Sequence, residues 1–290
     1  VTIPEGVTRL EGGTFYGCTK LESVTLPEGL LSIGDDNDWY GAFGNCTSLK
    51  SIAIPDSVTS IGGSVFSGCS SLTSVTIPEG VTSIDSDAFY GCSSLTSITI
   101  PENVTSIGSR AFEDCSSLTS ATILGKITEI QYETFYNCTS LESVTLPDGL
   151  LKIGGPTPGG SGKGAFENCS SLKGIVIPDS VTSIAPRAFE NCSSLVSVSI
   201  PDAVTVIDYA TFSGCTSLES IFLSSNLQKI GRSHYVDAFV NCTNLKDVYY
   251  SGDEVAWKQI DGWDNLPSSA YIHYGTPHIC TTHLIPAVAP

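Results

Sequence analysis

A repeat of 23 residues runs through most of this chain and constrains its fold more than any other feature. The unit reads A-F-x-x-C-x-x-L-x-x-I-x-I-P-x-x-V-x-x-I-x-x-x, as in residues 88–110. Its cysteine recurs ten times, always with Phe three residues before it and Leu three residues after it, at Cys18, Cys46, Cys69, Cys92, Cys115, Cys138, Cys169, Cys192, Cys215 and Cys242. Such units stack along one axis, so a length of 290 residues does not by itself predict several globular domains.

Each unit divides into three segments with different spacings of apolar residues. L-x-x-I-x-I predicts a short β-strand with one buried face, and it matches the L-x-x-L-x-L core of leucine-rich repeats. A proline then ends the strand, because it has no N–H to donate and it favours a turn. V-x-x-I predicts a second extended or bent segment on the back. The spacing of three in A-F-x-x-C-x-x-L predicts one or two turns of helix, partly 3₁₀.

Together these segments predict a leucine-rich repeat solenoid of about ten repeats, with parallel β-strands, short helical or 3₁₀ turns and a C-terminal cap. We expect a right-handed solenoid over residues 1–248, with eleven parallel strands between Ile3 and Tyr250. The chain begins inside a strand-like Val1–Pro4, from which we expect an upstream leader or further repeats.

The repeat pattern ends near Tyr249, and the residues that follow predict a cap over residues 249–274. The cap should contain a short helix over Asp253–Ile260 and a strand over Ala270–Tyr274. Because a solenoid must cover its open core, we expect buried roles for Trp257, Ile260 and Trp263. Residues 275–290 are expected to form a tail or linker.

The residue before each repeat cysteine is always Gly, Asn or Asp. These residues tolerate a positive φ, so we interpret the position as left-handed backbone that ends the turn. Five Asn copies also create N-C-S/T sequons, but the backbone explanation covers the Gly copies too. For the cysteines themselves we favour buried free thiols; disulfides between neighbouring repeats and metal binding are the alternatives.

Composition and charge narrow the possible functions. Asp and Glu number 30 against 13 Lys and Arg, which gives a net charge of −17. Such a chain should repel nucleic acid and anionic membranes, and no apolar run is long enough for insertion into a membrane. Catalysis is not expected, because nine repeat cysteines have no histidine in their repeat and no paired-carboxylate cleft is visible. His278, Cys280 and His283 form a weak candidate metal cluster in the expected tail.

Three repeats carry inserts at the same phase, so the inserts should protrude from the same side of the solenoid. The first contains Asp35, Asp36, Asn37 and Asp38, whose oxygens suit Ca²⁺, but no calcium-loop template matches and no cofactor is predicted.

Aromatic residues near these inserts are the candidate partner-binding residues. Trp and Tyr dominate binding hot spots, which points to Trp39 and Tyr40; the alternative is that both fold back over the core. The third insert adds His234 and Tyr235.

The outward positions of the strands are mostly Ser and Thr, a row that suits tight stacking rather than binding. An ice-binding or glycan-binding plane is the alternative. Phe222 and Tyr249 break this row near the C-terminus and complete the candidate set.

The repeated A-F-x-x-C-x-x-L-x-x-I-x-I-P-x-x-V-x-x-I resembles the BspA-like, Treponema-type leucine-rich repeats over roughly residues 1–248. The closing segment from Val248 to Tyr274 is similar to a cap that follows such repeats in gut Firmicutes, which implies a gut bacterium. The resemblance implies a bacterial cell-surface or secreted, non-enzymatic adhesion module. Its partner would be a protein such as the host matrix proteins fibronectin and fibrinogen. We expect a monomer. The alternative is a structural spacer or stalk with no ligand of its own.

Overall fold

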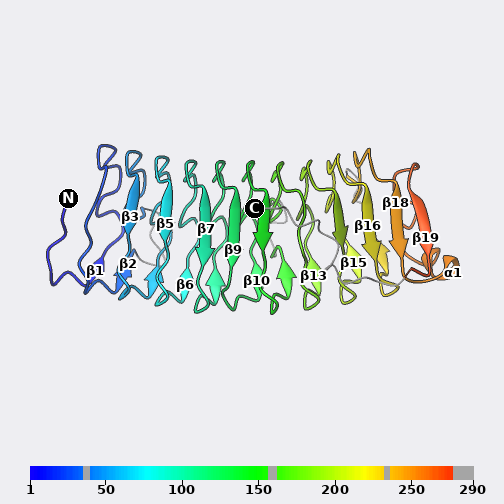
Figure 1. Cartoon of the computed structure of the whole chain (residues 1–290), viewed down its shortest axis with the longest axis horizontal. Coiled ribbons are helices and arrows are strands. Elements are labelled where there is room, and N and C mark those ends of the chain that lie inside the picture. Colours follow the sequence, from blue (N-terminus) through cyan, green and yellow to red (C-terminus); the bar gives the residue numbers. More distant parts are fainter. Residues whose placement is uncertain (35–39, 156–161, 232–235, 277–290) are drawn as a thin grey trace, which may run out of the picture.

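The computed structural model describes residues 1–34, 40–155, 162–231 and 236–276. These residues form one elongated stack of coils, which follow one another along a single axis from β1 (Arg9–Leu10) to β19 (Tyr271–Tyr274) (Figure 1). Successive coils pair in parallel along the stack, which confirms the predicted solenoid of parallel β-strands. Every coil crosses two parallel ladders, one on each side of the core.

The first ladder is built by the L-x-x-I-x-I segments, as predicted. Its strands are β3 (Ser51–Ala53), β5 (Ser74–Thr76), β7 (Ser97–Ile100), β9 (Ser120–Ile123), β11 (Ser143–Thr145), β14 (Ser197–Ser199), β16 (Ser220–Leu223), β18 (Asp247–Tyr250) and β19.

The prediction of eleven strands before the cap is wrong at three rungs. In the described residues Thr2, Thr25 and Gly174 make single bridges, Thr2 with Thr25 and Gly174 with Ser197. A glycine in a strand has no side chain to pack and loses more entropy on ordering, which explains the weak pairing at Gly174.

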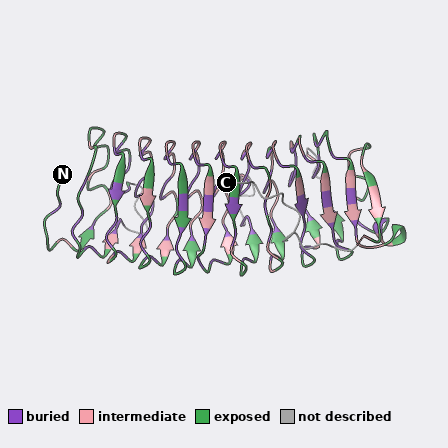
Figure 2. Ribbon diagram, viewed as in Figure 1, coloured by how far each residue is buried: buried purple, intermediate pink, exposed green. Residues whose placement is uncertain are grey.

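The second ladder is formed by the back segments that the V-x-x-I pattern predicted. Its strands have two residues each: β1, β2 (Ser32–Ile33), β4 (Ser60–Ile61), β6 (Ser83–Ile84), β8 (Ser106–Ile107), β10 (Glu129–Ile130), β12 (Lys152–Ile153), β13 (Ser183–Ile184), β15 (Val206–Ile207) and β17 (Lys229–Ile230). The second residue of each strand, which is Leu10 in β1 and isoleucine in the others, is buried, whereas the first residue is exposed or half-buried (Figure 2).

The segment around each cysteine differs from the prediction in one detail, because it forms separate turns instead of helix. The N–H of Cys92 donates to the Phe89 carbonyl oxygen at 3.1 Å, and the N–H of Leu95 donates to the Cys92 carbonyl oxygen at 3.0 Å. Gly91 lies in the first of these turns with φ 67°, which confirms the predicted left-handed position and stops a helix from propagating.

A second left-handed position lies two residues before the phenylalanine, and the sequence pattern did not reveal it. It is occupied by Ser64, Asp87, Arg110, Glu133, Arg187 and Ala210. Positive φ costs such residues about 1 kcal/mol or more. Bonds between coils hold them there: the N–H of Asp87 donates to the Ser109 carbonyl oxygen at 3.0 Å.

The core is a column of phenylalanines that runs the length of the solenoid. Consecutive rings stack with centroids 5.3–5.6 Å apart, over Phe15, Phe43, Phe66, Phe89, Phe112, Phe135, Phe166, Phe189, Phe212 and Phe239. Each repeat is therefore held chiefly by its two neighbours.

The repeat cysteines line the core beside these rings. All ten are free, which contradicts the disulfide alternative, and nine are buried as predicted. The thiol of each buried cysteine donates to the carbonyl oxygen of the phenylalanine one repeat earlier, as from Cys138 to Phe112 at 3.1 Å. Burial raises the pKa of Cys46 to about 11 and that of Cys69 to about 12. Cys18, in the first coil, is exposed, so the prediction of burial is wrong there.

The C-terminal end of the core is covered by α1 (Glu254–Trp257), a shorter helix than predicted. Its N-cap Asp253 accepts from the N–H of Ala256 at 2.8 Å. Trp257 is buried and packs edge-on against Tyr250, with ring centroids 5.1 Å apart. Trp263 does not share this role, because it is 40% exposed. Within the described ranges, no helix is long and apolar enough to cross a bilayer.

Candidate functional site

The outward face of the first ladder is plain over most of its length. In β7, Ile98 and Ile100 point into the core while Ser97 and Thr99 are exposed. The same alternation of small hydroxyl residues recurs on β5 and β11. A surface of short side chains at even spacing has no pocket and few anchors for a partner.

Three aromatic rings replace this pattern at the C-terminal end of the first ladder. The parallel register of β16, β18 and β19 aligns Phe222 with Tyr249 and Tyr249 with His273. Their ring centroids are 4.7 Å apart at each step, with interplanar angles of 12° and 15°. We call Phe222, Tyr249 and His273 the aromatic ladder. All three are half-buried, so the stack is partly open to solvent.

The last rung of the aromatic ladder is fixed by polar and aromatic contacts. The Nε2 atom of His273 lies 2.7 Å from Oδ1 of Asp247, on the neighbouring strand. Tyr271 packs edge-on against the imidazole, with ring centroids 4.8 Å apart, and is 67% exposed. A hydrogen bond and an aromatic pair thus orient one imidazole, which makes the end of the ladder a preorganised surface.

The stacking direction decides what the ladder can contact. Because the rings stack face to face along the solenoid axis, both faces of Tyr249 are covered, whereas the outer face of His273 stays open at the end of the stack. A sugar ring stacks on an aromatic face, which Tyr249 does not offer, since Phe222 and His273 lie over its two faces. The open edges and the polar groups of Tyr249 and His273 instead suit the mixed apolar and hydrogen-bonding contacts of a protein surface.

The structure brings together only part of the predicted set of binding residues. Phe222 and Tyr249 are neighbours in the aromatic ladder. Tyr40 lies near the other end of the solenoid, 59% exposed, and packs edge-on against Tyr16 with centroids 4.8 Å apart. Tyr40 therefore does not fold over the core.

The remaining predicted residues lie outside the described ranges. They are Trp39, His234 and Tyr235, together with the oxygen cluster Asp35, Asp36, Asn37 and Asp38 and the tail cluster His278, Cys280 and His283. Within the described residues, no group of three or more His, Cys, Asp or Glu side chains could hold a metal ion.

Sequence reasoning did not include His273, Tyr271 or Asp247 among the binding residues. The signal was present, because residues 270–274 were predicted to be a strand. Had that strand been aligned as a further rung beside β18, His273 would have followed Tyr249.

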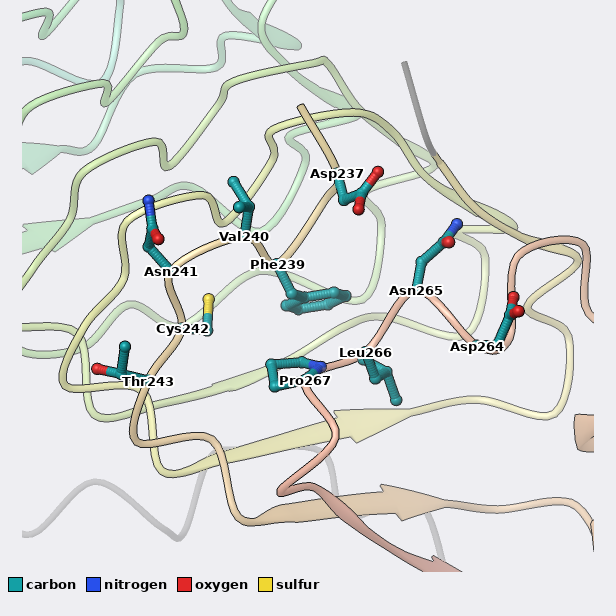
Figure 3. Close-up of a pocket in the computed structure, with 10 residues that line it drawn as sticks. All are labelled: Asp237, Phe239, Val240, Asn241, Cys242, Thr243, Asp264, Asn265, Leu266 and Pro267. Atoms are coloured by element: carbon teal, nitrogen blue, oxygen red, sulfur yellow. The ribbon is translucent and has the colours of Figure 1, made fainter. Parts of the chain in front are cut away.

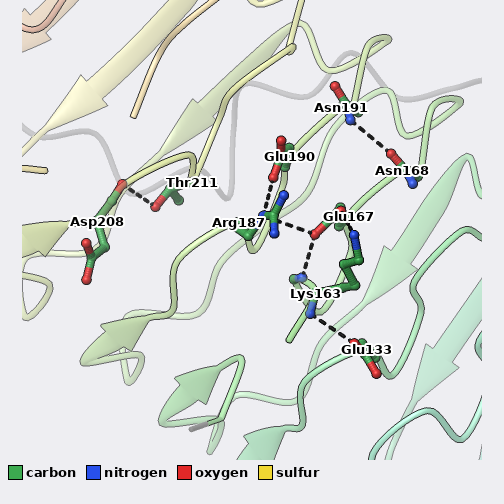
Figure 4. Close-up of polar contacts among 10 residues, drawn as sticks. Glu133, Lys163, Glu167, Asn168, Arg187, Glu190, Asn191, Asp208 and Thr211 are labelled. Atoms are coloured by element: carbon green, nitrogen blue, oxygen red, sulfur yellow. Dashed lines mark hydrogen bonds and ion pairs between the residues drawn. The ribbon is translucent and has the colours of Figure 1, made fainter. Parts of the chain in front are cut away.

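Charged side chains cluster on the turns at the edge of the solenoid (Figure 4). The Nε of Arg187 lies 2.6 Å from Oε2 of Glu190 and 3.6 Å from Oε2 of Glu167. Glu167 also accepts from the N–H of Gly164 at 2.9 Å, and burial raises its carboxyl pKa. Lys163 approaches Glu167 at 3.8 Å (Figure 4).

Arg110 holds a matching group of carboxylates elsewhere along the same edge. Its Nε lies 2.6 Å from Glu113, 3.4 Å from Asp87 and 3.6 Å from Glu133. Burial raises the pKa of the Glu113 and Asp87 carboxyls. Each carboxylate has an arginine partner and each arginine sits at the strained left-handed position, which makes these clusters supports for the turns.

Two shallow hollows lie among the described residues, and no residue of the aromatic ladder lines either of them. One, of about 380 Å³, lies between the last repeat and the cap loop, where Phe239 and Cys242 face Leu266 and Pro267 (Figure 3). The other, of about 680 Å³, follows the edge of five successive repeats and is lined by Asn, Ser, Thr and Gly, namely Asn137, Thr139, Asn168, Ser170, Asn191, Ser193, Gly214, Thr216, Asn241 and Thr243.

Much of the polar lining of the larger hollow is satisfied internally. Asn191 donates to the Asn168 Oδ1 atom at 3.0 Å (Figure 4), and Asn137 donates to Asp114 at 2.7 Å. The hydroxyl of Ser193 donates to the Ser170 carbonyl oxygen at 3.2 Å. Such bonds from repeat to repeat stabilise the edge of the stack and leave few groups for a ligand.

Comparison with known proteins identifies relatives of the whole array. The family model for the BspA type leucine rich repeat region matches residues 1–37, 40–157 and 161–256. A leucine rich cell surface protein from Faecalibacterium prausnitzii A2-165 is 30% identical, with a TM-score of 0.49, over 90% of this chain and 81% of its own.

Two further solved structures resemble the chain. The T. pallidum leucine rich repeat protein is 26% identical, with a TM-score of 0.51, over 67% of this chain and 77% of its own. A leucine-rich repeat protein from Bacteroides ovatus ATCC 8483 is 28% identical, with a TM-score of 0.43, over 94% and 91%. No curated protein matches the sequence.

Proposed function

Because the chain belongs to the BspA type leucine-rich repeat family, we propose that it is a non-enzymatic protein-binding module of a bacterial cell surface or of a secreted bacterial protein. Its contact surface is the aromatic ladder, together with Tyr271. The partner class that the family resemblance suggests is a host extracellular-matrix protein, and the chain binds it as a monomer.

One observation carries the proposal. The outward row of the first ladder is Ser or Thr on most rungs, and it changes to Phe222, Tyr249 and His273 on the last three. Three half-exposed rings contribute nothing to the core, which the buried column of phenylalanines already fills. Aromatic anchors in a preorganised surface are typical of binding hot spots.

Charge supports a protein partner with a basic surface. The net charge of −17 raises the encounter rate with a cationic partner and opposes association with nucleic acid or anionic lipid. At the aromatic ladder itself, Asp247 lies beside His273 and is accessible from outside.

Binding to immobilised fibronectin and fibrinogen, and then to a wider panel of matrix proteins, tests the proposal. The double variant Phe222→Thr/Tyr249→Thr restores the residue type of the other repeats and removes two rings. We expect it to weaken binding about 30-fold or more, the loss typical of a hot spot.

The double variant Tyr16→Thr/Tyr40→Thr is the matched control, because it removes two surface rings at the other end of the solenoid. If only this control variant lost binding, the contact surface would be the side of the solenoid that carries the inserts, and not the aromatic ladder. Binding that survives both substitutions would contradict the proposal. A chain that binds no protein in the panel would favour the second candidate, a structural spacer, which the plain Ser/Thr face of β5, β7 and β11 supports.

A further inference from the structure

The first ladder ends at β19, whose outer edge is unpaired among the described residues. β19 pairs with β18 on one side and stands last in its sheet. In Figure 1 it is the outermost strand at the C-terminal end, and α1 lies near the lower end of this strand. Within the described residues, the cap therefore covers the core without adding a strand beyond β19.

The hydrogen bonds of β19 show which backbone groups face this edge. The N–H of Tyr271 donates to the Lys246 carbonyl oxygen at 2.7 Å, and the N–H of Gly275 donates to the Gly252 carbonyl oxygen at 2.8 Å. Since alternate residues of a strand direct their backbone groups to opposite sides, Ile272 and Tyr274 direct theirs to the outer edge.

This edge lacks the features that usually prevent pairing. Proteins protect exposed edges with lysine, proline, bulges or very short strands. The four residues of β19 are Tyr-Ile-His-Tyr, with regular parallel register along all of them. Tyr271 is 67% exposed and Tyr274 is 39% exposed, so neither residue is covered by the described part of the cap.

From this we propose that an extended, basic peptide segment of the protein partner adds to β19 as the next strand of the ladder. The inference rests on the proposed function and specifies how the partner is held. Backbone bonds to Ile272 and Tyr274 supply the affinity, as in other cases of strand addition to a sheet edge.

Two features define the chemistry of the added segment. A side chain opposite His273 continues the aromatic ladder, so an aromatic residue there stacks on the imidazole face that Tyr249 leaves open. The exposed carboxylate of Asp253 at the start of α1 and the net charge of −17 favour flanking lysines, whereas Glu254 already pairs with Lys258 at 2.6 Å. Alternating β-branched residues suit the strand conformation.

The probe is the peptide acetyl-Lys-Thr-Val-Tyr-Val-Thr-Lys-amide, titrated into the whole chain and followed by NMR. We expect the Ile272 and Tyr274 amides to shift and to exchange at least about tenfold more slowly with solvent, as amides do when they gain a partner. Peptides N-methylated at one or the other set of alternate residues form a control pair. Methylation of the N–H groups that face β19 should abolish binding, whereas methylation of the N–H groups that face away from it should preserve binding.

Two variants at Tyr274 separate the contribution of the backbone N–H to peptide binding from that of the side chain. Tyr274→Ala removes the ring, whereas Tyr274→Pro removes both the ring and the outward N–H. We expect Tyr274→Pro to bind the peptide about tenfold more weakly than Tyr274→Ala, with the Tyr249 and His273 ring signals unchanged as proof that the ladder persists.

Equal binding by the two variants, or equal binding by both methylated peptides, would overturn strand addition. If a matrix protein still bound and lost affinity in Phe222→Thr/Tyr249→Thr, the proposed function would stand without it. Slowed exchange that depended on protein concentration in the absence of peptide would assign the edge to a second copy of this chain, which also contradicts the proposal.

Discussion

The phenylalanine column predicts that the cost of removing a ring depends on its place in the stack. Phe112 is fully buried and lies between Phe89 and Phe135, at 5.3 and 5.4 Å. Phe112→Ala should therefore lower the free energy of unfolding by about 4 kcal/mol, the usual cost for a buried phenylalanine. Phe15 is partly exposed and stacks only on Phe43. With part of its burial and one stacking partner absent, Phe15→Ala should cost about 2 kcal/mol.

Urea unfolding followed by circular dichroism measures both variants against the parent chain. Phe112→Leu serves as the control for ring loss without a large cavity, with an expected cost of about 1.5 kcal/mol. A similar slope with denaturant would show that the same surface unfolds in each case. If Phe15→Ala proved as costly as Phe112→Ala, the column would not be a nearest-neighbour stack and the reasoning would fail.

Three more predictions follow from the turns, the carboxylates and the thiols. Gly91 has a positive φ, so Gly91→Ala should cost about 1 kcal/mol by thermal unfolding and Gly91→Asn clearly less, since Asn fills this position in other repeats. Burial raises the folded-state pKa of Glu113 above 4.5, so the folded state binds the proton more tightly; stability should rise as pH falls from 7 through that raised pKa, and Glu113→Gln should flatten this part of the profile. An unchanged profile would contradict that account. In a Cys280→Ser variant, Ellman's reagent at pH 8 should modify only Cys18 until the chain unfolds, because the other repeat thiols are buried. Rapid reaction of further thiols in the folded chain would refute this.

Much of the fold could be read from the repeat because each position of the unit has one physical role. The Phe, Cys and Leu spacing predicted the core, and the Gly, Asn or Asp before each cysteine predicted left-handed backbone, as Gly91 and Asn137 confirm. Apolar spacing by three predicted one or two turns of helix, partly 3₁₀; the structure has turns with the i to i+3 hydrogen bonds of a 3₁₀ turn, and they do not continue into a helix. Trp263 was misassigned because apolar character alone does not say which cap residue reaches the core.

The candidate site was only partly visible from the sequence. Phe222 and Tyr249 stood out because they interrupt a row of Ser and Thr. The aromatic ladder was not visible, since its rungs are separated by 27 and 24 residues and break the repeat period. Hydrogen bonds between strands set the register there, and these bonds depend on where the cap returns β19 to the sheet.

The sequence by itself determined the solenoid, because a similar unit repeated ten times can bury its apolar face only against its own copies. The tertiary structure decided what the breaks in the repeat do. Bonds between coils hold Asp87 and Arg110 at positive φ, where their own preferences would not place them. The pairing of β19 with β18 places His273 over Tyr249 and leaves one strand edge open, since neighbours across a sheet are chosen by register and not by distance along the chain.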